Sequence, residues 1–212
     1  MAFRKYKTIG EVLEAYQIEL RTSDFLVNSK SVDVPDILVK ELDFVIRHLP
    51  YKISEAAIGE MIIFPILKEI WKMFATKLML WSHKSISFTK ELTSVPDYLI
   101  ARSSPLGVVV LDTPLLAVVE AKKDDFEGGW AQCALEMYTI QKINKNADIP
   151  VFGIVSNGDN WEFGRLTGQL LEQHLVATPL YPVEILYSQL CTLMHACVLN
   201  IDRYEVGKCR EK

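Results

Sequence analysis

The sequence predicts an α/β domain in which helices cover a mixed central β-sheet. Apolar residues at helical spacing dominate the beginning of the chain, and runs rich in Val, Ile and Leu dominate its middle. With 212 residues, half of them hydrophobic, the chain can bury a sizeable core. We expect a single domain over 1–212, made of an N-terminal helical segment (1–50), a core (51–170) and a C-terminal strand and helix (171–212).

Three helices are expected before the first strands. Residues 8–17 have apolar side chains at helical spacing. A second helix should begin at Pro35, a residue favoured in a first turn, and stop before Pro50. A third, longer helix should begin near Ser54, which is suited to be its N-cap, and Pro65 should kink or divide it.

Strand patterns begin after about residue 78. Residues 84–92 alternate between polar and apolar, as in a half-buried strand. Residues 96–102 and 107–122 are rich in Val, Ile and Leu, and Asp112-Thr113-Pro114 is expected to be a turn within the second run.

A helix, a hairpin and a last helix are expected after these strands. The helical pattern of residues 128–144 has two glycines at its start. The apolar runs 150–156 and 161–167 flank Asn157-Gly158, a strong signal for a β-hairpin. Residues 182–201 should form the final helix.

The composition argues against a membrane-spanning protein and leaves nucleic-acid binding open. No apolar stretch is long enough to cross a bilayer, and the N-terminus lacks the apolar region of a signal peptide, so we expect a cytoplasmic protein without a membrane partner. A net charge of −4 is not typical of a protein whose whole surface binds the phosphate backbone of nucleic acid. It remains compatible with nucleic acid, because a divalent cation would offset the charge of a carboxylate site.

The four cysteines contain no CxxC pair. Cys191 and His195 are four residues apart on an expected helix and could share a face, but no further ligands accompany them. We interpret Cys133, Cys191, Cys197 and Cys209 as buried or idle thiols rather than as a zinc site.

The chemically informative segments are Pro96-Asp97 and Glu120-Ala121-Lys122. Residues two apart on a strand point to the same face, so Glu120 and Lys122 should project together at the end of an apolar run. Two carboxylates from neighbouring strands would hold a hard cation such as Mg²⁺, and the lysine could orient a water molecule. The alternative is a salt bridge at a strand end with Asp97 as an ordinary turn residue, since short motifs also match by chance.

Three further features favour the site. Glu120-Ala121-Lys122 is the only Asp/Glu-x-Lys in the chain, and the other Pro-Asp, Pro35-Asp36, is explained by its place at a helix start. The helix upstream carries Glu55 and Glu60 among apolar residues, which is costly without a partner. Gln132 lies on the helix that follows the strand of Glu120, where its amide should approach the same end of the sheet.

These motifs resemble the PD-(D/E)XK nuclease superfamily, which has the restriction endonuclease-like fold. The resemblance consists of a helix with Glu, then PDYLIAR, then AVVEAKKDDFEGGWAQCALEM, then VFGIVSNGDNWEF, and covers about residues 54–166. Its last part resembles prokaryotic members related to type I restriction subunits. The resemblance therefore implies a restriction endonuclease-like core.

Carried over by position, the resemblance implies roles for individual residues. Asp97 and Glu120 would be metal ligands, with the Ala121 carbonyl as a third. Lys122 would be the catalytic lysine, and Gln132 would support the water or the DNA backbone.

The resemblance does not decide which helical glutamate binds the metal, or whether cleavage is by an endonuclease or an exonuclease. Glu55 is preferred to Glu60 as a further metal ligand, because it lies near the start of its helix. The Gln-x-x-x-Tyr of RecB-like members is absent, since Tyr138 is six residues after Gln132, so exonuclease activity does not follow.

The expected function is hydrolysis of phosphodiester bonds in DNA with Mg²⁺ or Mn²⁺. A catalytically silent nucleic-acid-binding or interaction module of the same fold is the alternative, and a purely structural salt bridge is a third. A homodimer is compatible by analogy, because cutting both strands often uses two copies. The sequence lacks helicase and methyltransferase motifs, so a role in restriction, repair or defence would need partner subunits encoded elsewhere.

Other polar and aromatic residues have simpler interpretations. The histidines His48, His83, His174 and His195 are scattered and are expected at the surface or in the core. Trp130 and Trp161 are expected to pack in the core, and Asp124 and Asp125 to belong to a solvated loop.

Overall fold

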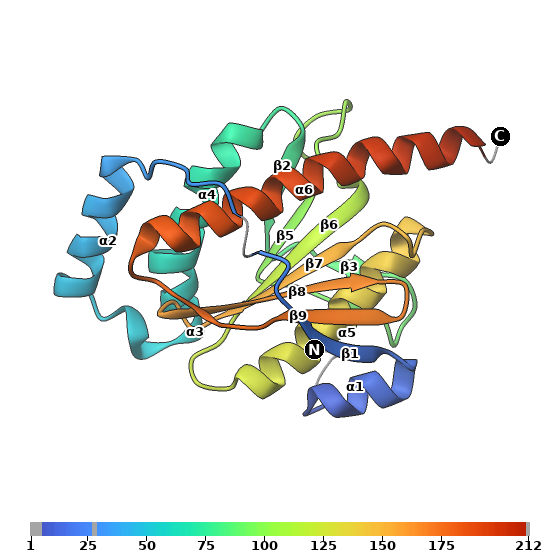
Figure 1. The fold of residues 1–212 in the computed structure, drawn as a ribbon, viewed down its shortest axis with the longest axis horizontal. Coiled ribbons are helices and arrows are strands. Elements are labelled where there is room, and N and C mark those ends of the chain that lie inside the picture. The colour runs from blue at the N-terminus through green and yellow to red at the C-terminus, as the bar shows by residue number, and fades with distance from the viewer. Residues whose placement is uncertain (1–5, 27–28, 211–212) are drawn as a thin grey trace.

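A mixed β-sheet of eight strands lies between two layers of helices (Figure 1). The structure, a computed structural model, describes residues 6–26 and 29–210. The strands follow the order β1-β9-β8-β7-β6-β5-β2, with the short β10 paired to β8. The pairs β6–β7 and β1–β9 are parallel, and the others are antiparallel. The strands are β1 (Glu19–Ser23), β2 (Leu78–Ser82), β5 (Tyr98–Arg102), β6 (Asp112–Ala121), β7 (Val151–Ser156), β8 (Asn160–Thr167), β9 (Leu170–His174) and β10 (Thr178–Pro179).

The two helical layers cover opposite faces of this sheet. Helices α1 (Ile9–Tyr16) and α5 (Phe126–Asn144) pack on one face, which includes Leu99 and Val118. The second layer packs on the other face, which includes Ile100 and Val119. It contains α2 (Asp36–His48), α3 (Glu55–Ile58), α4 (Phe64–Trp71) and α6 (Val183–Arg210). The predicted α/β class with a mixed sheet flanked by helices is therefore confirmed.

The N-terminal helices form where the sequence predicts them. The side chain of Ser54 accepts a hydrogen bond from the Ala57 N–H and caps α3. The expected long helix is divided by a π-helical turn, η3 (Gly59–Ile63), directly before α4. Pro65 follows this π-helical turn directly, in a backbone that stays helical, and the wider turn accommodates the absence of the proline N–H. Short 3₁₀ turns, η2 (Tyr51–Ile53) and η4 (Lys72–Phe74), flank this region.

Two strand predictions were wrong. Asp112-Thr113-Pro114 is not a turn but the start of β6, where Asp112 pairs with Arg102 of β5. The connection instead comprises residues 103–111, in which Val108 and Val109 are 71% and 79% exposed despite their β propensity. Residues 84–92 do not form one strand. They contribute only β3 (Ile86–Ser87), which pairs with β4 (Thr93–Ser94) in a separate two-stranded sheet closed by a turn at Thr89.

The expected hairpin is confirmed by the antiparallel pair β7–β8, with Gly158 at a φ of +85° in its loop. The final helix is longer than predicted and extends to Arg210. Among the described residues, no helix combines the length and apolar character that a membrane crossing requires.

Candidate functional site

Glu120 lies near the end of β6, at the interface between the sheet and α5. Its side chain is on the same face as Val118, which packs under α5, and it is only 1% exposed. Strands β5 and β6 pair Tyr98 with Val119. Asp97 directly precedes this pair, and its charge acts on Glu120, so the two carboxylates lie close together at this end of the sheet.

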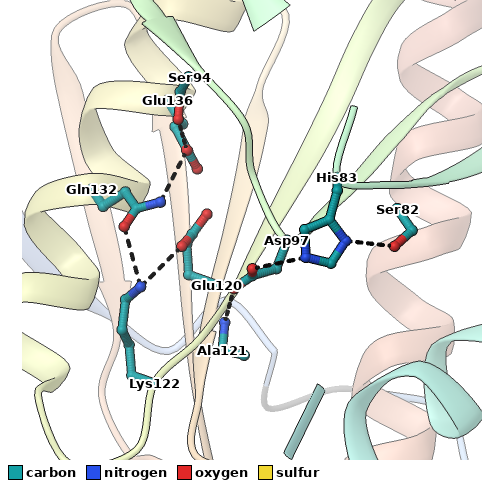
Figure 2. Close-up of polar contacts among 9 residues, drawn as sticks. All are labelled: Ser82, His83, Ser94, Asp97, Glu120, Ala121, Lys122, Gln132 and Glu136. Atoms are coloured by element: carbon teal, nitrogen blue, oxygen red, sulfur yellow. Dashed lines mark hydrogen bonds and ion pairs between the residues drawn. The ribbon is translucent and has the colours of Figure 1, made fainter. Parts of the chain in front are cut away.

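Asp97 is fixed by the backbone of the neighbouring strand. Its Oδ2 accepts a hydrogen bond of 2.8 Å from the Ala121 N–H (Figure 2). Its Oδ1 lies 3.6 Å from Nε2 of His83, whose Nδ1 is 2.8 Å from the Ser82 Oγ. His83 is an exposed residue, as the sequence allowed, and has a left-handed φ of +51°. The sequence did not indicate that it lies beside Asp97.

Lys122 points back toward the end of the same strand. Its Nζ is 3.2 Å from Glu120 Oε2 and donates a hydrogen bond of 3.1 Å to Gln132 Oε1 (Figure 2). The lysine side chain is 13% exposed. Its stem passes Gly129 of α5, where an added Cβ would lie 2.8 Å from Lys122 Cγ and 2.7 Å from Val155 Cγ1. The absence of a side chain at Gly129 therefore allows Lys122 to lie between β6 and α5.

Glu136 completes the cluster and was missed in the sequence. It is fully buried on α5, one turn after Gln132. Its Oε1 accepts hydrogen bonds from the Ser94 hydroxyl and, at 3.4 Å, from Gln132 Nε2. The spacing of four residues from Gln132 was the signal that could have revealed it.

Burial and like charges perturb the acids of the cluster. Burial, together with the charges of Glu136 and Asp97, raises the pKa of Glu120 well above its usual value. Burial also raises the pKa of Glu136, against the hydrogen bonds that stabilise its ionised form. For Lys122, burial alone would lower the pKa, but the Glu120 carboxylate and neighbouring acids raise it, which keeps the ammonium charged.

The donor set fits a small divalent cation. Glu120 Oε1 is buried, and the Glu120 carboxyl is hydrogen-bonded to the facing carboxyl of Glu136. Within residues 6–26 and 29–207, no group of three or more His, Cys, Asp or Glu side chains is arranged to hold a metal. A cation here would therefore bind to two carboxylates and complete its shell with water, which is how proteins commonly hold Mg²⁺.

The two helical glutamates lie close to different parts of the site. Glu55, the first residue of α3, raises the pKa of Lys122 through its charge, whereas Glu60 raises that of Tyr98. The preference for Glu55 as a ligand stays a prediction, as does the use of the Ala121 carbonyl.

The remaining polar and aromatic candidates lie elsewhere. Trp130 and Trp161 are 4% and 0% exposed and pack in the core, as predicted. Asp125 caps α5 by accepting a hydrogen bond from the Gly128 N–H. Burial raises the thiol pKa of Cys133, Cys191 and Cys197, which are buried as predicted, whereas the side chain of Cys209 lies outside the described residues.

Comparison of the chain with protein-family models, with curated proteins and with solved structures found no match.

Proposed function

We propose that the chain is a metal-dependent nuclease of the PD-(D/E)XK type that hydrolyses phosphodiester bonds in DNA. The observation that carries the proposal is the end of β6, where the buried Glu120 lies beside the half-buried Lys122 and Asp97 accepts a hydrogen bond from the Ala121 N–H. A structural salt bridge would gain nothing from a second buried acid beside it, yet Glu136 faces Glu120 and both pKa values are raised. A bound cation would offset the charges of these acids.

The order of elements supports the same proposal. A helical segment with Glu55 precedes β5 and β6, and α5 then connects β6 to the parallel strand β7. This is the order of the segments on which the resemblance to the superfamily rests. The proposed restriction endonuclease-like core, residues 51–170, thus runs from η2 and α3 through α4, β2, β5, β6, α5 and β7 to β8.

Each residue has a defined task in the proposed reaction. A bound Mg²⁺ or Mn²⁺ would polarise the phosphoryl oxygen and lower the pKa of its water. Asp97 and Glu120 would hold the cation. The Lys122 ammonium, kept charged by Glu120 and oriented by Gln132 Oε1, would position the attacking water and offset the charge on the phosphate.

The test is cleavage of linear, nicked, branched and single-stranded DNA in Mn²⁺ or Mg²⁺, with EDTA as a control. Wild type would be compared with Lys122→Ala and with Lys123→Ala, which removes an adjacent exposed lysine. We expect metal-dependent cleavage that Lys122→Ala abolishes and Lys123→Ala retains, and Mn²⁺ affinity that Asp97→Ala reduces.

Each failure has its own meaning. Cleavage that survives in Lys122→Ala would refute the role of the lysine. Metal binding without cleavage on any substrate would favour a binding module that keeps the fold. The absence of both metal binding and cleavage would mean that Glu120 and Lys122 form only a salt bridge.

A further inference from the structure

His83 and Asp97 lie opposite one another, just beyond the paired ends of β2 and β5. The His83 N–H donates a hydrogen bond of 3.0 Å to the Asp97 carbonyl, one step past the pair of Ser82 and Tyr98. This contact fixes the two backbones, and the side chains face each other, with His83 Nε2 3.6 Å from Asp97 Oδ1 (Figure 2). The imidazole is therefore held beside a carboxylate that the proposed function assigns to the metal.

The two oxygens of Asp97 have different neighbours. Oδ2 accepts a hydrogen bond of 2.8 Å from the Ala121 N–H, and Oδ1 faces His83. On the other side of the ring, His83 Nδ1 is 2.8 Å from the Ser82 Oγ. A carboxylate opposite Nε2 favours the tautomer in which Nε2 carries the proton, and the Ser82 hydroxyl can then donate to Nδ1. Ser82, His83 and Asp97 thus form a chain of polar contacts that ends on the carboxylate.

The backbone of His83 gives this chain of contacts further weight. Its φ of +51° is a left-handed conformation, which is unfavourable for a residue with a side chain and which glycine adopts freely. The side chain is 66% exposed and touches Tyr98 only edge-on, with ring centroids 6.3 Å apart, so packing does not explain a histidine here. Backbone strain of this kind is concentrated at functional sites. The contact with Asp97 supplies the reason that packing does not.

We propose that Ser82 and His83 are positioning residues that hold the Asp97 carboxylate in the orientation in which it binds the cation. The inference rests on the proposed function, because it takes Asp97 as a metal ligand. Each oxygen of a carboxylate has two lone pairs, so Asp97 can accept both hydrogen bonds and still bind a metal. The exposed ring needs to move only about 0.5 Å closer to make a full hydrogen bond to Oδ1. Loss of such a hydrogen bond to a ligating group typically weakens metal binding about 10–100-fold.

The test is the affinity of the full chain for Mn²⁺, measured by titration calorimetry and by the electron paramagnetic resonance signal of free Mn²⁺, together with the melting temperature without metal. His83→Gly removes the imidazole and suits the left-handed backbone. We expect its dissociation constant for Mn²⁺ to rise about 10–100-fold while its melting temperature stays equal or rises. His83→Gln should recover most of the affinity, because its amide Nε2 can still donate to Asp97.

Lys145→Gly is the matched control. Lys145 is exposed at the end of α5 and has a similar left-handed φ of +55°, so glycine relieves the same backbone strain there. This variant should bind Mn²⁺ like wild type. Ser82→Ala should weaken Mn²⁺ binding less than His83→Gly does, and should have no further effect in the His83→Gly chain, because Ser82 acts through the imidazole.

The outcomes separate this inference from the proposed function. Wild-type Mn²⁺ affinity in His83→Gly, with cleavage still dependent on Lys122, would overturn the positioning role and leave the nuclease proposal intact. Weaker Mn²⁺ binding together with a lower melting temperature, in both His83→Gly and His83→Gln, would show a merely structural role and would also overturn it. No Mn²⁺ binding to wild type would overturn both proposals.

Discussion

Replacing Gly129 with alanine tests whether the helix α5 positions Lys122. The added Cβ would lie 2.7 Å from Val155 Cγ1 and 2.8 Å from Lys122 Cγ, closer than Cβ contacts in proteins normally are. Val155 is fully buried in β7 and cannot withdraw, so the stem of Lys122 must move. We expect this movement to weaken the contacts of Lys122 with Glu120 and Gln132.

Two opposing effects set the change in stability. Overpacking of this kind costs about 1–3 kcal/mol. Alanine in a helix gains about 0.5–1 kcal/mol over glycine. The net destabilisation should be about 1 kcal/mol, a fall in melting temperature of about 2–4 °C for a chain of this size.

Gly10→Ala provides the matched control. Gly10 lies exposed in α1, and the nearest atom to its added Cβ is 3.8 Å away. This variant should gain stability by the propensity effect alone, about 0.5–1 kcal/mol. Urea unfolding of both variants and DNA cleavage in Mn²⁺ are the measurements. If Gly129→Ala were stabilised like Gly10→Ala and cleaved DNA at the wild-type rate, the argument that Gly129 makes room for Lys122 would fail.

Two further predictions concern pH and a buried amide. Burial and the charge of Glu136 raise the pKa of Glu120 in the folded state above its ordinary value of 4.5. The protonated carboxyl therefore stabilises the fold fully below pH 4.5, and this stabilisation is lost as pH rises through the raised pKa. Urea unfolding without metal should therefore show Glu120→Gln gaining stability relative to wild type as pH rises above 4.5, and a constant difference would contradict this. The Asn144 side chain binds both the N–H and the carbonyl of Leu115, so Asn144→Ala should cost about 1–3 kcal/mol for each buried group left unpaired. The exposed Asn160→Ala is the control, expected to change stability by less than about 0.5 kcal/mol, and an equal loss in both would refute the assignment.

The local patterns around the site were sufficient to predict its main geometry. The period of two on a strand places Glu120 and Lys122 on one face, as found. Adjacency of β5 and β6 then brings Asp97 to the same end of the sheet, where it binds the Ala121 N–H, because successive strands commonly pair. Gln132 follows on the helix that crosses over to the parallel strand, and reaches Lys122.

Features that depend on distant contacts could not be predicted in this way. Strand β1 pairs with β9 from the other end of the chain, and its residues are largely exposed, so no apolar alternation marks it. The run that contains Val108 and Val109 has strong β propensity but forms an exposed connection. Propensity describes a fit to a half-buried pleated surface, and this segment has no surface to pack against.

Glu136 escaped prediction for a different reason. Helix α5 lies deep between α1 and the sheet, and polar residues such as Thr139, Gln141 and Asn144 are buried along it together with the apolar ones. A helix buried on most sides has no polar face by which a functional glutamate could be distinguished. Its spacing of four residues from Gln132 was the one signal in the sequence, and the contacts with Ser94 and Gln132 show that Glu136 belongs to the site.

The charges of the cluster link the metal proposal to the substrate. Burial and mutual proximity raise the pKa of both Glu120 and Glu136, and a hydrogen bond joins them, so the pair can hold one proton between them. Asp97 and the pair then carry two negative charges, and Lys122 supplies one positive charge. One divalent cation would turn this net charge of −1 into +1, as a phosphodiester and its more negative transition state require. The buried Glu136 would therefore keep a proton close to Glu120 and limit the negative charge that a single cation has to offset.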